Sequence, residues 1–307
     1  MIVSHLFDRN IRLWGMSAAK KLSASHVMVL GLGGVGSFAV EGLARAGIGI
    51  LTLVDFDDIC ITNVNRQLHA LPSTIGKSKA QLMADRVRLI NPGIQAEPIP
   101  AFYEASTSRA MLARKPDLII DAIDNVTAKL HILATSIMRE IPIVTCLGAS
   151  GKVDPTLVRT NDLRKTKKDP LAKTIRKNLW RKYRINLQRV SDLIAVYSEE
   201  EPAAPQTAEL PSLCGTTCVC PNSANEHHTC AKRSIIWGSS VFVTSMFGMT
   251  AASLAVRFLT GDPAIRLTPV TTNLPGDDPM IDPAQATSEE NNEGNDENEA
   301  EILLDPA

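Results

Sequence analysis

Residues 31–49 read GLGGVGSFAVEGLARAGIG and follow the short apolar run HVMVL at 26–30. The turn holds four glycines, of which the first, second and fourth stand at GxGxxG spacing: Gly31, Gly33, Gly34 and Gly36. Such a run lets the chain turn tightly after a strand, brings bare backbone close to a phosphate and opens a helix whose N-terminal amides face that anion. The stretch therefore predicts a strand, a nucleotide-binding turn and a helix in succession.

A second apolar strand, ILTLVDF at 50–56, carries Asp55 near its end. At this place a carboxylate can bind the hydroxyls of a ribose. An NAD-dependent dehydrogenase would show the same glycines and the same acidic residue. These features alone therefore predict Rossmann-like nucleotide binding without choosing the nucleotide.

Strand-like and helical patterns alternate through the first half of the chain. Apolar runs lie at 26–30, 50–56, 94–102, 116–124 and 141–149, and helical patterns at 76–92, 109–115 and 125–140. This alternation predicts an α/β fold with a mostly parallel, Rossmann-like sheet covered by helices on both faces. We expect residues 1–158 to form the nucleotide-binding domain. Residues 159–270 should continue the same globule, and 271–307 should be an acidic, disordered tail.

Charge is distributed unevenly along the chain. From residue 276 to the end there are eleven Asp or Glu and no Lys or Arg, so residues 1–275 hold 32 basic against 22 acidic side chains. Residues 159–189 alone hold twelve Lys or Arg against two Asp, in a pattern that we expect to be helical. Two interpretations remain open: a solvated helix face, or a surface that binds a polyanion. The acidic tail is either inert or a competitor for that surface.

Hydropathy and cysteine usage favour a cytoplasmic protein without stable membrane association. The N-terminus lacks the basic and apolar regions of a secretory signal. The apolar stretch at 239–261 contains Arg257 and several Ser, Thr and Gly, which favours a buried or interface helix over a membrane span. The six cysteines are expected to be thiols or ligands rather than disulfides.

Beyond Asp55 the sequence supplies groups suited to a nucleotide whose triphosphate is split. They are hydrogen-bond donors and two positive charges, supplied by Asn63, Arg66, Gln67 and Lys79. Splitting a triphosphate requires such cations, whereas hydride transfer does not. Asp124, after a strand, could hold Mg²⁺ against the phosphates. These residues favour ATP over NAD.

The motifs GLGGVG, DFDDICITNVNRQ, GKSK and DAIDN, in this order, resemble the ubiquitin-activating-enzyme superfamily, also called ThiF-type adenylating enzymes. The resemblance implies an ATP site and the conversion of a carboxylate to an acyl-adenylate with release of pyrophosphate. It implies that Asp55 holds the ribose and that Asp124 lies by the metal and the α-phosphate. It assigns the nucleotide and its phosphates to Asp57, Asn63, Arg66, Gln67 and Lys79.

The same resemblance implies a homodimer. An arginine of the neighbouring subunit, matching Arg9 in FDRNIRLWG, would reach the phosphates, with Arg12 as the alternative if the register slips. The residues counted as catalytic are thus Arg9, Arg66, Lys79 and Asp124.

Three further stretches, GKVDPT at 151–156, KTKKDPLA at 165–172 and VYSEEEP at 196–202, resemble the branch that dehydrates threonylcarbamoyl-adenosine in tRNA. The implied reaction adenylates the threonyl carboxylate beside the anticodon, after which the carbamoyl nitrogen closes a ring and AMP leaves. The basic segment would then bind the anticodon stem-loop. Its expected tRNA contacts are Arg164, Lys165, Lys167, Lys168, Lys173, Arg176, Lys177, Arg181 and Lys182.

Two alternatives to this function remain. An adenylyltransferase for ubiquitin-like sulfur-carrier proteins would share the first half, but such enzymes commonly carry two CxxC pairs and this chain has none. A non-catalytic tRNA-binding scaffold would not need Arg66, Lys79 and Asp124. Pyrophosphate release with each substrate separates these possibilities.

The segment 199–234 is expected to be a loop rich in cysteine. Cys214, Cys218, Cys220 and Cys230, with His227 and His228 nearby, could close a zinc or iron–sulfur site. Their spacing is irregular, so thiols without a ligand are the alternative. One of these thiols could instead relay sulfur, with a cysteine desulfurase or sulfur acceptor as partner.

Overall fold

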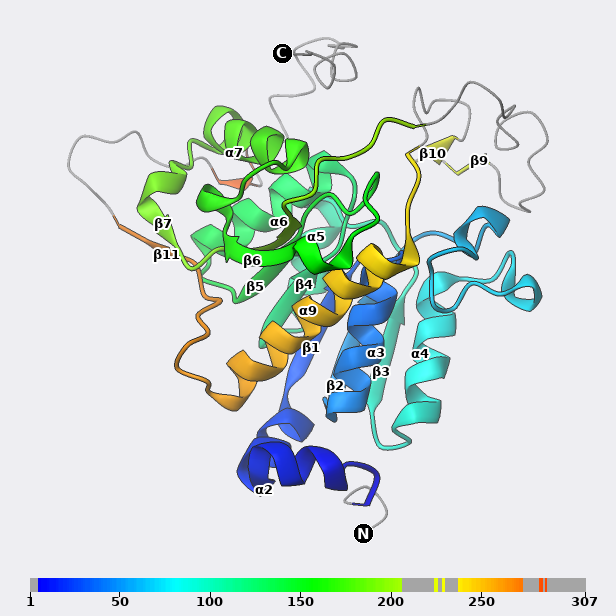
Figure 1. The fold of residues 1–307 in the computed structure, drawn as a ribbon. Helices are drawn as coiled ribbons and strands as arrows, with labels where there is room; N and C mark the ends of the chain where they lie inside the picture. The colour runs from blue at the N-terminus through cyan, green and yellow to red at the C-terminus, as the bar shows by residue number, and fades with distance from the viewer. Residues whose placement is uncertain are drawn as a thin grey trace.

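A computed structural model describes residues 5–205, 224–225, 228–229, 237–272, 282–283 and 285. Its main sheet has seven strands in the order β3-β2-β1-β4-β5-β8-β6 (Figure 1). These strands are β1 (His26–Leu30), β2 (Ile50–Val54), β3 (Gln95–Ile99), β4 (Leu118–Asp121), β5 (Ile143–Cys146), β6 (Val158–Asp162) and β8 (Ile194–Ser198). Within this sheet only the β6–β8 pair is antiparallel. The predicted mostly parallel sheet is confirmed.

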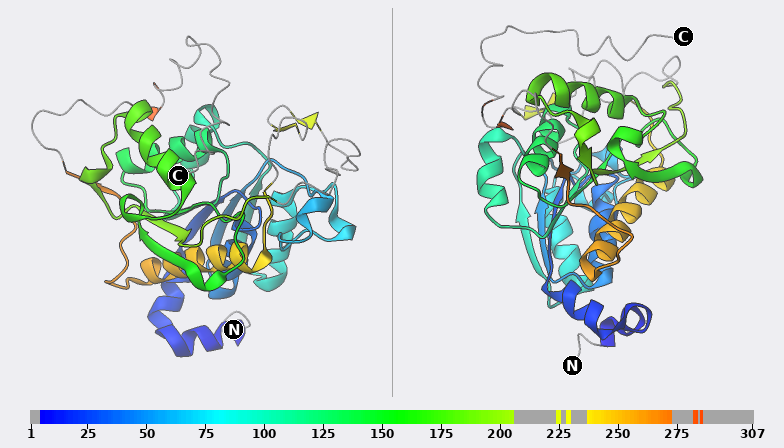
Figure 2. Two further views of the ribbon diagram at one scale, coloured as in Figure 1. Left: turned by 45° about the horizontal axis from the view of Figure 1, so that its top comes forward. Right: turned by 90° about the vertical axis from the view of Figure 1, so that its left-hand side faces the viewer.

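Helices cover both faces of the sheet, as predicted. The helices are α2 (Asp8–Ala24), α3 (Gly36–Ala46), α4 (Lys79–Ile90), α5 (Ala105–Leu112), α6 (Val126–Met138), α7 (Pro170–Tyr183) and α9 (Val241–Thr260). Side chains of α3, α4 and α9 share one hydrophobic core, and those of α5, α6 and α7 share the other. Figure 2 shows the sheet between these two layers. Because strand side chains alternate, Val27 and Val29 of β1 enter the first core and Met28 enters the second.

Short elements connect the main ones. The 3₁₀ helices are η1 (Ile61–Asn63), η2 (Pro72–Thr74), η3 (Pro155–Leu157), η4 (Leu163–Lys165) and η5 (Leu187–Arg189). Two small antiparallel ladders pair β7 (Val190–Ser191) with β11 (Val270–Thr271) and β9 (Ala224–Asn225) with β10 (His228–Thr229).

The apolar helix α9 packs along α3. Val243, Phe247, Ala251 and Ala255 are fully buried. At Gly248 an added Cβ would lie 2.2 Å from the carbonyl oxygen of Val35, so only glycine allows this close approach. In the described part of the chain α9 is the one helix long and apolar enough to cross a membrane, and half of its most apolar window is buried inside the molecule. The packing supports the expected buried helix.

The basic segment is not helical throughout, which corrects the expectation for residues 159–189. Its first part forms β6, an edge strand whose middle residues are exposed, because Val158–Asp162 pairs with β8. The helix α7 starts only after Asp169, whose Oδ1 accepts a hydrogen bond from the backbone N of Ala172. It ends at Tyr183 and is followed by Arg184, which has a left-handed φ of 54°.

Candidate active site

The glycine turn joins β1 to α3 at the carboxyl edge of the sheet. Gly31 has a φ of 83°, and a Cβ there would lie 2.7 Å from the carbonyl oxygen of Ala122. At Gly36 a Cβ would lie 1.8 Å from the carbonyl oxygen of Gly31. Side chains at either position would therefore open the turn. The geometry leaves the N-terminus of α3 at the edge where nucleotides bind in such sheets.

Asp55 ties the end of β2 to the glycine turn. Its Oδ2 accepts a hydrogen bond from the backbone N of Leu32 at 2.6 Å, and its Oδ1 accepts one from the backbone N of Asp57 at 2.9 Å. Burial raises the pKa of the Asp55 carboxyl group, against the opposing effect of the Lys79 cation. The carboxylate thus shapes the site in addition to the ribose contact predicted for it.

Lys79 is a buried cation at the first position of α4. Its side chain is only 6% exposed, and its Nζ lies 2.8 Å from Oδ2 of Asp57. Burial alone would lower the pKa of Lys79, but the carboxylates of Asp55, Asp57 and Asp124 outweigh it, and the pKa is raised. The amine therefore stays protonated at neutral pH. Of the carboxylates around it, Asp124 is exposed to solvent.

Arg66 and Gln67 lie over the glycine turn. A Cβ added at Gly34 would be 3.3 Å from Cγ of Arg66, and one added at Gly33 would be 3.8 Å from Nε2 of Gln67. Nη1 of Arg66 donates to the carbonyl oxygen of Thr62 at 2.9 Å. The sequence prediction that these side chains face one nucleotide is therefore consistent with their positions.

Asn63 is turned toward its own loop. It is 8% exposed, and its Oδ1 accepts a hydrogen bond from the backbone N of Cys60 at 3.0 Å. Its carbonyl oxygen accepts from the backbone N of Arg66 and of Gln67. In this structure Asn63 thus fixes the loop that carries both residues.

A buried ion pair that sequence reasoning missed supports the loop of Asp124. Nζ of Lys129 lies 2.6 Å from Oδ2 of Asp121, and both side chains are completely buried. The same Nζ donates to the carbonyl oxygen of Cys146 at 2.9 Å, and Oδ1 of Asp121 accepts from the backbone N of Ile123 at 3.1 Å. The pair thus joins α6, β4 and β5. The signal was a lysine inside the otherwise apolar helical run at 125–140.

The three stretches quoted for the tRNA-modifying branch meet in a second cluster. Lys152 donates to the carbonyl oxygen of Gly148 at 2.7 Å and lies 3.6 Å from Oδ2 of Asp169, with both charged side chains buried. Glu200 accepts hydrogen bonds from the backbone N of Val153 and of Asp154, each at 2.9 Å. Burial lowers the pKa of Lys152 in spite of Asp169 and Glu200. The sequence motifs named these residues, but their contact appears only in the fold.

The loop after β5 is connected to the loop of Arg66. Oγ of Ser150 lies 3.2 Å from Oγ of Ser239, and Nδ2 of Asn65 donates to the carbonyl oxygen of Ser239 at 3.0 Å. Because β1, β4 and β5 are neighbouring parallel strands, the loops after them share one edge of the sheet. The Lys152 cluster thus borders the nucleotide side of the molecule.

Arg9 does not reach the glycine turn of its own chain. It is exposed on α2, and Figure 1 places α2 at the opposite end of the sheet from the N-terminus of α3. The helix is fixed there because Asn10 donates to the carbonyl oxygen of Arg45 at 2.7 Å. The ring of Phe7 also lies beside the end of α3, 3.5 Å from where a Cβ at Gly47 would be. Arg9 could meet a nucleotide only in another copy of the chain.

The zinc or iron–sulfur site predicted from the sequence falls almost entirely outside the described residues. No group of three or more His, Cys, Asp or Glu side chains among the described residues could hold a metal ion. Four of the cysteines, Cys214, Cys218, Cys220 and Cys230, lie outside the described residues, as does most of the acidic tail. Burial raises the pKa of Cys146 to about 12, so this thiol is not a thiolate nucleophile at neutral pH.

His69 makes the folded state sensitive to acid. Neither ring nitrogen has a hydrogen-bond partner in the described structure, and burial, with the nearby Lys79 and Arg86 cations, lowers the pKa of His69 to about 3. The unfolded chain binds this proton near pH 6.5, so stability should fall as the pH drops below that value. When the pH is lowered from 7 to 5, the free energy of unfolding should decrease in both proteins. We expect the decrease to be about 2 kcal/mol smaller in His69→Leu than in the parent.

Urea unfolding at both pH values measures this difference. His131, whose pKa burial lowers to about 4, provides a second titrating site and remains in the variant as an internal reference. Equal losses of stability in parent and variant would show that His69 is not the acid-sensitive group.

Comparison with known proteins identifies the family of this chain. The sequence profile of the ThiF family matches residues 7–294. The chain belongs to the ThiF family. A tRNA threonylcarbamoyladenosine dehydratase of Escherichia coli is 37% identical over 255 residues, which cover 82% of this chain and 92% of the relative. One of Bacillus subtilis is 42% identical over 198 residues, covering 64% and 76%. Within the ThiF family the chain thus belongs with the tRNA threonylcarbamoyladenosine dehydratases.

A solved structure gives the same assignment of this ThiF-family chain. The Escherichia coli tRNA threonylcarbamoyladenosine dehydratase in complex with ATP matches with a TM-score of 0.69 and 33% identity, covering 85% of this chain and 96% of that one. A molybdopterin-synthase adenylyltransferase of Escherichia coli, from the alternative class, is 34% identical over only 45% of this chain. The alternative is therefore more distant.

Proposed function

We propose that this chain is an ATP-dependent enzyme that dehydrates threonylcarbamoyl-adenosine in tRNA. The threonyl carboxylate attacks the α-phosphorus of ATP, and pyrophosphate leaves. The carbamoyl nitrogen then attacks the activated carbonyl carbon and loses a proton, and AMP departs with one former carboxylate oxygen. A ring forms, and the substrate has lost the elements of water.

The observation that carries this proposal is the buried cation of Lys79 at the carboxyl edge of the sheet, beside the glycine turn. A buried, permanently protonated amine can stabilise charge that develops on phosphate oxygens, and it needs no reorganisation at the moment of reaction. Arg66, which lies over the same turn, offers a planar fork for a second phosphate contact. We assign both residues to the transition state of adenylation.

The other nucleotide contacts are assigned from the positions of the residues around the glycine turn. We assign Asp55 to the ribose and the backbone of Gly33 and Gly34 to the phosphates. The side-chain atoms nearest to a Cβ added at these two glycines belong to Arg66, Gln67 and Thr244. Asp57 would orient Lys79 through their 2.8 Å contact. Asn63 would keep this loop in place.

Mg²⁺ fits this site with Asp124 as its protein ligand. The ion is usually held by one or two carboxylates together with phosphate oxygens and waters. Asp124 is exposed at the carboxyl edge and close enough to Lys79 to raise its pKa. When bound, the ion would neutralise phosphate charge.

The tRNA would bind the basic surface formed by β6, η4 and α7. Lys165, Lys167, Lys168, Lys173, Lys177 and Arg181 are all exposed, and together they can contact several phosphates. We place Arg164, Arg176 and Lys182 at the same surface. The cluster of Lys152, Asp169 and Glu200 lies between this surface and the edge of the sheet assigned to the nucleotide. It would hold the loop after β5 beneath the modified adenosine.

Activity should require a homodimer in which Arg9 serves the partner's nucleotide. Leu13 and Met16 of α2, and Leu6 shortly before it, are each at least half exposed, as expected for an interface. Mixing an Arg9→Ala chain with a Lys79→Ala chain should restore about a quarter of the parent activity, because half of the dimers are mixed and each has one complete site. Steady-state turnover after proven subunit exchange measures this recovery.

Each single variant alone should stay inactive in that experiment, which controls for residual activity. No recovery in exchanged mixtures would place Arg9 in its own chain's site or give it a structural role.

Location, domain limits and sulfur chemistry are parts of the same proposal. We place the enzyme in the cytoplasm with tRNA, and we keep 158 as the end of the adenylation domain, where β6 begins. A sulfur relay through the segment 199–234 would need a cysteine desulfurase or an acceptor as partner.

The proposed function is tested by pyrophosphate release from ATP. We expect release with tRNA that carries threonylcarbamoyl-adenosine and none with tRNA that lacks it. Release only with a sulfur-carrier protein would instead support the alternative adenylyltransferase.

A further inference from the structure

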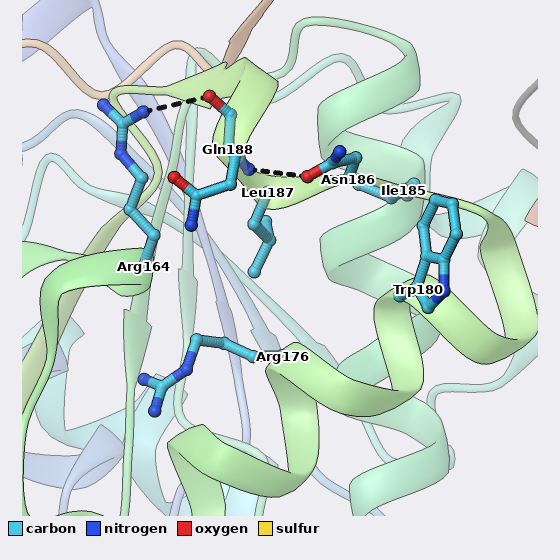
Figure 3. Close-up of a pocket in the computed structure, with 7 residues that line it drawn as sticks. All are labelled: Arg164, Arg176, Trp180, Ile185, Asn186, Leu187 and Gln188. Atoms are coloured by element: carbon cyan, nitrogen blue, oxygen red, sulfur yellow. Dashed lines mark hydrogen bonds between the residues drawn. The ribbon is translucent and has the colours of Figure 1, made fainter. Parts of the chain in front are cut away.

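A hollow outside the nucleotide site lies between α7 and η5. It has a volume of about 390 Å³ and is lined in part by Arg164, Arg176, Trp180, Asn186 and Gln188. Figure 3 shows these side chains arranged around it, with the two arginines on one side and Trp180 on the other. The volume lies at the low end of the range of roughly 300–1,000 Å³ in which pockets bind small organic ligands.

The hollow is held open by its own backbone. After α7, Arg184 adopts a left-handed φ of 54° and the chain reverses. Oδ1 of Asn186 then accepts a hydrogen bond from the backbone N of Gln188 at 3.0 Å, which starts η5. Nη1 of Arg176 donates to Oγ1 of Thr166 at 2.6 Å, which fixes that arginine on the opposite side.

The lining is positively charged, polar and aromatic, with two aliphatic residues, Ile185 and Leu187, completing it. No carboxylate is among the side chains described around it. Arg164 is partly compensated, since its Nε lies 3.2 Å from Oδ1 of Asp162. Trp180 is 48% exposed, although a large aromatic side chain is usually covered in a protein without a partner. These groups suit a flat ring next to an anion.

Trp180 belongs to a basic face of α7. Lys173, Lys177 and Arg181 are exposed and follow one another at intervals of four residues, so they lie on one side of the helix with Trp180 among them. Arg184, directly after the helix, is exposed as well. The face extends well beyond the hollow. A free nucleotide would fill the hollow without contacting the basic face of α7. A nucleic acid strand could place a base in the hollow and its phosphates along that face.

We propose that this hollow binds one unpaired nucleobase of the RNA that carries the modified adenosine. The base stacks on Trp180, its edge meets the amides of Asn186 and Gln188, and the neighbouring phosphates meet the two arginines and the basic face of α7. Bases stack on aromatic side chains in this way when the strand is single. The inference rests on the proposed function for its choice of RNA, and it predicts that the enzyme binds a loop rather than a duplex.

Trp180 itself reports the binding. Trp14 and Trp237 are the other tryptophans of the chain, and replacing both with phenylalanine leaves Trp180 as the sole source of tryptophan fluorescence. An anticodon stem-loop, unmodified and without ATP, should quench this fluorescence. A duplex of the same length should bind through its phosphates without quenching.

Measurements of Kd distinguish the contribution of base stacking from that of phosphate contacts. W180A should raise the Kd of the stem-loop about tenfold, and W180F, which keeps an aromatic face, should stay within about threefold of the parent. W180A should leave the Kd of the duplex unchanged, whereas K173A should weaken stem-loop and duplex alike. Leu89→Ala, which removes another exposed apolar side chain, should change neither.

Three outcomes would overturn the inference: equal weakening of stem-loop and duplex by W180A, quenching by AMP as strong as by the stem-loop, or displacement of the stem-loop from Trp180 by an acidic peptide. Failure of this inference can be distinguished from failure of the proposed function, because stem-loop binding is measured without ATP. An enzyme that fails to dehydrate tRNA could still show the stacking, and an active enzyme could lack it.

Discussion

Replacing Lys79 with alanine should lower the rate of adenylation about a hundredfold or more while the fold is retained. The side chain is the buried cation next to the glycine turn, and the phosphates would lose a positioned partner for the charge of the transition state. Removing one such group typically costs 10²–10³ in rate, or about 3 kcal/mol. Single-turnover pyrophosphate release at saturating ATP and modified tRNA measures the effect.

Two further variants locate the origin of that loss. Lys79→Ala leaves Asp55 and Asp57 without their cation, so its thermal unfolding must be recorded to exclude a loss of folded protein. Lys79→Arg keeps the charge near Asp57 and should recover part of the rate. Asp55→Ala should mainly raise the ATP concentration required, because ribose contacts stabilise the ground and transition states alike. Normal turnover by folded Lys79→Ala would show that the phosphates bind elsewhere.

The largest effect on stability should come from Lys129. Replacing it with methionine leaves the carboxylate of Asp121 completely buried without its cation. Removing one partner of a buried ion pair costs about 3–5 kcal/mol, because an uncompensated charge remains. Urea unfolding of Lys129→Met should show this loss in the free energy of unfolding.

The matched control removes both charges. Asp121→Leu combined with Lys129→Met should recover most of the stability, since a buried pair and apolar residues of similar size are often nearly equivalent. A double variant as unstable as Lys129→Met would mean that Asp121 is needed for its contacts with Ile123 and Thr145 rather than as the partner of Lys129.

The core of the fold could be predicted from local patterns. The runs at 26–30 and 50–56 have the length and apolar character of buried parallel strands, and they form β1 and β2 with nearly the same limits. The glycine turn was predictable because Gly31 and Gly36 meet steric demands that only glycine satisfies. Local sequence therefore determined the strand, turn and helix around the nucleotide side.

Long-range pairing could not be predicted in this way. Residues 158–162 carry no strong strand pattern, and they become β6 because β8 offers a free edge at Ile194–Ser198. The contact of Lys152 with Asp169 joins residues far apart in the chain, and its buried charges are visible only once the loops after β5 and before α7 meet. Asp55 was predicted to hold a ribose, and its contact with the amide of Leu32 was not foreseen.

The central claim is that the threonyl carboxylate is activated as an acyl-adenylate, and an oxygen label tests it most directly. Threonylcarbamoyl-adenosine tRNA with oxygen-18 in the threonyl carboxylate is incubated with the enzyme, ATP and Mg²⁺, and the released nucleotide is analysed by mass spectrometry. The account predicts one labelled oxygen in AMP for each ring formed, because the carboxylate oxygen stays on the α-phosphate when the carbamoyl nitrogen displaces AMP. Unlabelled AMP, or label in inorganic phosphate with ADP as the nucleotide product, would contradict it.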